Sequence, residues 1–218
     1  MIVQEQEVLA KQIYLIKYAR PRGVDPPVTR VMFCSGNCSE RMRAAGFPVA
    51  DKVVVDLYCG IGYYTLPLLV HGRARRVHAC EMNPDSVAAL RRNLLAAGVA
   101  PDRCVIHEGD NRETTAGLRD VADCVSLGLL PSSEEGWPLA ARVLRREGGA
   151  LHVHQNVDEA QVRSGVWVAQ CLSRLEALLL AEGKPMRLRC AHLERVKSYA
   201  PRVLHVVADI ECVPLEVK

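Results

Sequence analysis

The sequence lacks the features of a secreted, disulfide-bonded or membrane-spanning chain. Its 218 residues include nine cysteines, an odd number, and no two of them form a C-x-x-C pair. We therefore expect reduced, buried thiols and neither a disulfide framework nor a zinc site. Charged residues such as Glu5 and Glu7 interrupt the apolar N-terminus, and no apolar run approaches the length that spans a bilayer. These absences predict a cytoplasmic protein with no membrane partner and no bound metal.

A strong net charge, internal repeats and low-complexity tracts are also absent. Twenty-eight basic residues face 25 acidic ones, a formal net charge of +3 that is compatible with a nucleic-acid partner without indicating one. Hydrophobic residues make up 49% of the chain, which suits one globular core. Residues 1–30 contain Pro21, Pro26 and Pro27, so we expect an N-terminal extension and linker there, followed by one domain over 31–218.

The most informative stretch lies at residues 53–64, where an apolar run and one acid precede two glycines. It predicts a short buried strand, a tight turn and the start of a helix. The dinucleotide fingerprint G-x-G-x-x-G is incomplete, because Thr65 occupies its third glycine position. The pattern D-x-x-x-G-x-G of S-adenosylmethionine (AdoMet) enzymes is complete in Asp56, Gly60 and Gly62. A strand–helix turn that binds no ligand remains the alternative.

Acidic and amide side chains follow the next two predicted strands. Residues 76–81 end in Glu81, whose distance from the glycine loop places its carboxylate where a ribose presents two hydroxyls. Residues 104–107 are followed by Asp110 and Asn111, at the position from which an acid accepts an adenine amine. Glu81 capping the following helix, and an Asx-turn at Asp110 or Asn111, are the structural alternatives.

The later strands offer no obvious acid–base group. Residues 122–131 read as strand four and its exit loop, which carries Ser126 and no charged base. Strand five, residues 148–156, places His152 and His154 on one face, and no third metal ligand accompanies them. We therefore expect packing or loop contacts for these two histidines.

The order of elements predicts the fold class. Alternating strand and helix patterns run to residue 156, one long helical pattern covers 158–182, and extended runs at 186–197 and 202–213 form an antiparallel pair. We predict an α/β fold, a Rossmann-like three-layer sandwich of the class I AdoMet-dependent methyltransferase type, with a terminal antiparallel strand pair.

Several of these stretches together resemble one enzyme family, that of tRNA wybutosine-synthesising protein 2. The resemblance covers most of residues 31–212, and it is carried by Met32–Arg43, DLYCGIGYYTLPLLVHG (56–72), ACEMNP (79–84), EGDNR (108–112), LGLLPSSEEGWP (127–138), LHVHQNV (151–157) and VKSYAPRV (196–203). It implies transfer of the 3-amino-3-carboxypropyl group of AdoMet to 4-demethylwyosine at position 37 of phenylalanine tRNA, with release of methylthioadenosine. The expected partner is thus the anticodon loop of that tRNA, and the expected enzyme a monomer.

The resemblance also implies cofactor contacts at Cys34, Arg41, Glu81, Asp110 and Asn111, and it assigns no residue to catalysis. Cys34 stands where the family has a serine, so the hydroxyl contact at that position is lost or passes to a neighbour. In the resemblance, Arg41 holds either the amino-acid carboxylate or a substrate phosphate.

Three alternatives stay open at this point. One is a tRNA guanosine-37 N1-methyltransferase-like activity on the same scaffold, and another is a small-molecule methyltransferase. The third is a truncated, non-catalytic AdoMet-binding variant, because family members carry a longer N-terminal portion and more sequence than residues 156–166 provide here.

Overall fold

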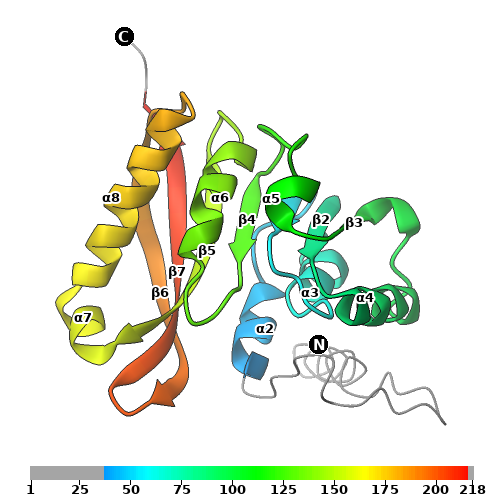
Figure 1. The fold of residues 1–218 in the computed structure, drawn as a ribbon, viewed down its shortest axis with the longest axis horizontal. Helices are drawn as coiled ribbons and strands as arrows, with labels where there is room; N and C mark the ends of the chain where they lie inside the picture. Colours follow the sequence, from blue (N-terminus) through cyan, green and yellow to red (C-terminus); the bar gives the residue numbers. More distant parts are fainter. Residues whose placement is uncertain (1–36, 216–218) are drawn as a thin grey trace.

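The computed structural model describes residues 37–215, which form one seven-stranded sheet flanked by helices (Figure 1). The strand order is β3-β2-β1-β4-β5-β7-β6. The first five strands are parallel, and β7 runs antiparallel to both β5 and β6. The strands are β1 (Val53–Asp56), β2 (Arg76–Glu81), β3 (Cys104–Glu108), β4 (Cys124–Leu127), β5 (Gly149–Asp158), β6 (Met186–Ala200) and β7 (Val203–Pro214). The predicted α/β fold with a terminal antiparallel pair is confirmed.

Helices cover both faces of the sheet. They are α2 (Cys38–Ala44), α3 (Thr65–Val70), α4 (Pro84–Ala96), α5 (Asn111–Thr114), α6 (Trp137–Val143), α7 (Glu159–Ser164) and α8 (Val166–Ala181), with short 3₁₀ turns at Pro101–Arg103 and Glu134–Gly136. One apolar core joins the sheet to α6 and α8 around Trp137, and a second joins it to α3 and α4 around Leu69. The strands β1 and β4 are buried at every position, as expected of central parallel strands covered on both faces.

The long helix expected over residues 158–182 is two helices, so that prediction was wrong. Gly165 lies between α7 and α8 with a φ of 72°. A residue in this left-handed conformation ends α7, and glycine adopts it without a Cβ penalty. The hydrophobic repeat continues across the break, which is why the sequence pattern alone did not reveal it.

A largely buried polar network connects α2 to β5 and β7. The Arg43 guanidinium binds the carboxylates of Glu40 and Asp209, and Asp209 Oδ1 lies 2.6 Å from Nδ1 of His152. Burial alone would lower the pKa of His152, but contacts with a neighbouring thiol and with Asp209 raise it to about 9. The ring of Phe47 stacks on His152 at 3.9 Å between centroids, which confirms the packing role expected for this histidine.

A buried lysine, Lys184, caps the carboxyl end of α6. Lys184 is 2% exposed, and its Nζ donates to the carbonyl oxygens of Ala141, Arg142 and Leu144 at 2.6–2.8 Å. Asp120 supplies the counter-charge at 2.5 Å. The lysine thus satisfies the carbonyls that a helix leaves unpaired at its carboxyl end.

Some expectations concern parts of the chain outside residues 37–215. The predicted extension over 1–30 and the position of Cys34 lie outside the described residues. Within the described part of the chain, no helix is long and apolar enough to cross a membrane.

Candidate functional site

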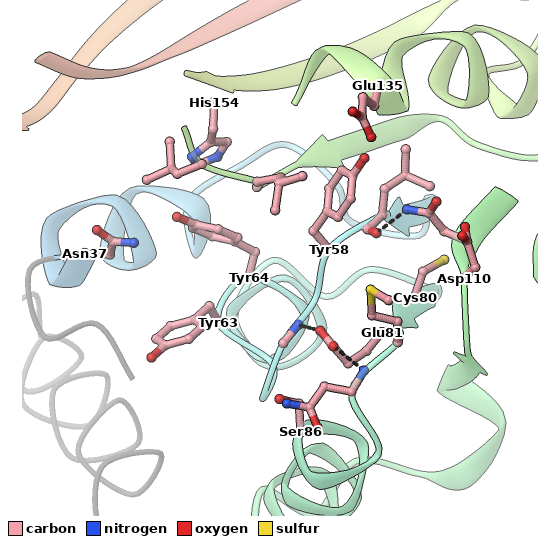
Figure 2. Close-up of a pocket in the computed structure, with 18 of the residues that line it drawn as sticks. Asn37, Tyr58, Tyr63, Tyr64, Cys80, Glu81, Ser86, Asp110, Glu135 and His154 are labelled. Carbon is pink, nitrogen blue, oxygen red and sulfur yellow. Dashed lines mark hydrogen bonds between the residues drawn. The ribbon is translucent and has the colours of Figure 1, made fainter. Parts of the chain in front are cut away.

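A cavity of about 610 Å³ opens at the carboxyl ends of the parallel strands (Figure 2). Its wall combines the loop after β1, the ends of β2, β3 and β4, and side chains from β5, β6 and β7. The volume falls within the range of small-molecule sites, and this edge of an open α/β sheet is where ligands usually bind.

Glu81 and Gly60 lie together on this wall, as the sequence predicted. Glu81 Oε2 accepts a hydrogen bond from the Gly60 amide at 2.9 Å, and Oε1 accepts one from the Asn83 amide at 2.7 Å. Each carboxylate oxygen has two lone pairs, so acceptor capacity for two hydroxyl groups remains. The capping alternative for Glu81 is also partly right, because Asn83 is the N-cap of α4. One carboxylate therefore holds both the glycine loop and the start of α4.

Asp110 and Asn111 reach the same cavity from the end of β3. Asp110 is the N-cap of α5: its Oδ1 accepts from the Arg112 amide at 2.9 Å, and its carboxylate pairs with the Arg112 side chain. These hydrogen bonds to Arg112 lower the pKa of Asp110. Asn111 donates from Nδ2 to the carbonyl oxygen of Leu57 at 2.9 Å. The turn predicted as an alternative is thus present, and it sets the edge of the cavity.

Asp56 and Gly62, the other members of the glycine motif, do not line the cavity. Asp56 is fully buried and its Oδ2 accepts from the Thr65 hydroxyl at 2.8 Å, while burial raises the pKa of Asp56 to about 6. Gly62 has a φ of 101°, and a Cβ there would lie 2.9 Å from Cδ1 of Leu90. Sequence spacing locates a residue along a strand, but not whether its side chain points over the edge or beneath it. Both residues therefore support the loop from below.

Arg41 is buried in α2 behind the cavity wall, and it does not itself line the cavity. Its guanidinium lies 5.4 Å from the ring centroid of Tyr63, a wall residue, and its Nη2 donates to Sγ of Cys38 at 3.0 Å. The side chain is 2% exposed, and Nε and Nη1 have no hydrogen-bond partner. Buried donors without partners are costly, and a guanidinium in that state favours an anionic ligand.

The sequence reasoning missed one side of the cavity entirely. Aromatic and cationic side chains form it: Tyr63, Tyr64, His154, Lys197, Tyr199 and His205. The tyrosines directly follow the glycine loop, which is a signal that could have been used. The contribution of β6 and β7 depends on the antiparallel pair folding back beside β5, and no local pattern reports that. Register shifts in β6 on either side of Lys197 place this lysine opposite His205.

Comparison with known proteins places this arrangement in a family. The family described as TRM5/TYW2 methyltransferase domain matches residues 23–177. The chain belongs to the TRM5/TYW2 family. Within it, the tRNA wybutosine-synthesizing protein 2 homolog of Danio rerio is 46% identical over 217 residues, covering 86% of this chain and 52% of that protein. The chain thus spans about half the length of this relative.

Solved structures of TRM5/TYW2 proteins share the fold. The crystal structure of M. jannaschii TYW2 in complex with AdoMet has a TM-score of 0.74 at 30% identity, covering 86% of this chain and 80% of that one. P. horikoshii TYW2 in complex with MeSAdo has a TM-score of 0.73 at 28% identity, covering 85% and 66%.

Proposed function

We propose that this TRM5/TYW2 chain transfers the 3-amino-3-carboxypropyl group of AdoMet to 4-demethylwyosine at position 37 of phenylalanine tRNA. The by-product is methylthioadenosine, and the acceptor carbon exchanges a hydrogen for the new carbon–carbon bond. The observation that carries the proposal is the cavity at the strand ends, where the Gly60–Glu81 pair and Asn111 meet.

The residues on this wall suit AdoMet as the co-substrate. The Glu81 carboxylate has lone pairs for a vicinal diol, and Asp110 and Asn111 lie at the far edge, where an adenine would reach. Beneath the wall, Asp56 and Gly62 fix the loop without contacting a ligand. The unpartnered nitrogens of Arg41 suit a carboxylate such as that of the amino-acid part. When bound, AdoMet supplies an activated carbon on a sulfonium.

Group choice is a matter of orientation, because all three carbons on a sulfonium are electrophilic and the one aimed at the acceptor reacts. Three observations favour the aminocarboxypropyl group over the methyl group. The Danio rerio homolog, named for wybutosine synthesis, is 46% identical, and the P. horikoshii relative is described in complex with MeSAdo, the by-product expected here. The loop after β4 (Gly128, Leu129, Leu130) contributes to the wall without a charged base for a ring nitrogen.

The same proposal includes the tRNA partner. The protein acts as a monomer and binds the anticodon loop of the tRNA. The cavity mouth carries Lys197 and Tyr199, and Tyr199 is 60% exposed. A cationic side chain can pair with the phosphate backbone, and an exposed aromatic ring can stack on a base that is unstacked in a single-stranded loop.

The test is one incubation with two readouts. The chain is mixed with AdoMet and phenylalanine tRNA carrying 4-demethylwyosine, and mass spectrometry follows both the nucleoside and the adenosine by-product. We expect methylthioadenosine and a nucleoside heavier by the aminocarboxypropyl group. The same tRNA with guanosine at position 37 is the control, and S-adenosylhomocysteine released with it would replace the proposal by guanosine methylation.

A further inference from the structure

Two buried histidines face the end of the cavity farthest from the predicted nucleoside contacts. His154 of β5 and His205 of β7 both belong to the wall, and Nδ1 of His154 lies 3.2 Å from Nε2 of His205. Figure 2 shows His154 across the cavity from Asp110. Four strand spacings separate β3 from β5, about 19 Å at roughly 4.8 Å each, which leaves room for a second molecule beside a nucleoside.

The hydrogen bonding of this pair is incomplete. His205 is 0% exposed, and its Nδ1 has no partner. Asn156, which pairs with His205 in the sheet, also has both amide atoms buried without a partner. Buried polar atoms are almost always satisfied, so a cluster of exceptions beside a cavity indicates a site that a ligand or a moving proton completes.

The environment keeps both rings neutral. Burial lowers the pKa of His154 far below its usual value, and burial together with the Lys197 charge lowers the pKa of His205 to about 4. Each neutral ring therefore has one N–H group and one nitrogen with a lone pair, and the contact between the rings uses the N–H group of one and the lone pair of the other. In the tautomer in which Nδ1–H of His154 donates to Nε2 of His205, the lone pair of His154 Nε2 is left for a ligand. The His154 ring lies 4.9 Å from the Tyr64 ring between centroids.

We propose that His154 accepts the proton that the acceptor carbon loses during transfer, and that His205 takes up the displaced hydrogen through the contact between the two rings. This inference rests on the proposed function. As the new carbon–carbon bond forms, the carbon–sulfur bond breaks and its electron pair goes to sulfur. The positive charge passes from the sulfonium to the acceptor nucleobase. Nε2 of His154 then takes the proton from the acceptor carbon, and the nucleobase becomes neutral again.

A weak base suffices for this step. A carbon that bears both a hydrogen and the new substituent on a cationic ring is strongly acidic, so a neutral imidazole with a low pKa can deprotonate it. The other bases on the wall are less suited: Glu81 and Asp110 are engaged on the opposite side, and Glu135 is exposed to solvent. His205 is a positioning residue, because it acts through His154.

The chain contains its own control for a test by substitution. His78 and His107 form a similar pair on β2 and β3, with Nδ1 and Nε2 3.0 Å apart, and neither lines the cavity. His154→Asn keeps an amide near the Nδ1 position and removes the Nε2 base, and His154→Gln is a second variant in case the first does not fold. His107→Asn should retain wild-type turnover.

Single-turnover rates and calorimetry with AdoMet separate binding from chemistry. We expect His154→Asn to bind AdoMet as the wild type does and to lose about 100-fold in rate, the lower end for removing a general base. A deuterium on the acceptor carbon should slow this variant more than the wild type, and added imidazole should restore rate to His154→Ala. These two readouts would not respond to a merely structural role.

The outcomes distinguish the inference from the proposed function. Wild-type rates in both His154→Asn and His154→Gln, with no isotope effect, would overturn the role of the histidine pair and leave the transfer reaction standing. A wild-type chain that binds AdoMet and forms no methylthioadenosine would overturn both.

Discussion

Glu81 offers the sharpest test of the cavity as a binding site. Its carboxylate accepts from the amides of Gly60 and Asn83 at 2.9 and 2.7 Å, and in the proposed complex it also accepts from two hydroxyls of a ribose. Glu81→Gln keeps the shape of the side chain but replaces one acceptor oxygen by an NH₂ donor. The new NH₂ group then faces a group that is itself a donor, either a backbone N–H group or a ribose hydroxyl. The charge-assisted hydrogen bond that this group made to the wild-type carboxylate is lost.

The magnitude follows from these contacts. Losing one hydrogen bond to a charged acceptor, with its donor left facing another donor, costs about 1.5–3 kcal/mol. At about 1.4 kcal/mol for each factor of ten, the AdoMet Kd of Glu81→Gln should rise about 10- to 150-fold. Isothermal calorimetry measures this Kd, and circular dichroism checks that the variant is folded.

The matched control is Glu108→Gln. Glu108 pairs with Glu81 in the register of β2 and β3, but it is exposed, contacts Arg91 at 3.5 Å and does not line the cavity. Its substitution should leave the AdoMet Kd unchanged. If Glu81→Gln binds AdoMet as tightly as the Glu108 variant, the assignment of Glu81 to the ribose is wrong.

Three further predictions concern stability. Lys184→Met should lower the free energy of unfolding by about 3–5 kcal/mol, because three buried carbonyls lose their donor and a carboxylate its counter-charge, and urea denaturation would measure the loss. The pKa of Asp56 is about 6 in the folded protein, against 3.8 for the free group, so ionisation of this residue should reduce stability by about 2 kcal/mol as the pH rises from 4 to 7; an NMR titration of the carboxyl that gives a value of 4 or less would contradict this. Gly62→Ala should lose about 1–3 kcal/mol by overpacking against Leu90, whereas Gly98→Ala, whose Cβ meets nothing within 4 Å, should lose less in the same thermal unfolding series.

Much of the fold was predictable because the local signals agreed with one another. The apolar run before the glycine loop became β1, and residues 76–81 became β2 with the expected bounds. Parallel strands bring their carboxyl ends to one edge, so the meeting of Glu81 and Gly60 followed from topology alone.

The rest depended on information that no local pattern contains. Asp56 stands at the expected end of β1, yet its side chain turns beneath the loop toward Thr65. The break at Gly165 does not interrupt the hydrophobic repeat. His154 and His205 are 51 residues apart, and only the return of β7 beside β5 brings them together.

The polar network that joins α2 to β7 can form only after β7 has been synthesised. Arg43 and Asp209 are separated by 166 residues, so the salt bridge between them can form only after residue 209 has left the ribosome. The strands β1 to β4 can pair earlier, since all four precede β5 and β7 in the chain. We therefore expect α2, which carries Arg41, to take its final position only once β7 has formed, and a nascent chain stalled before β7 would have part of the sheet but lack the His205 side of the cavity.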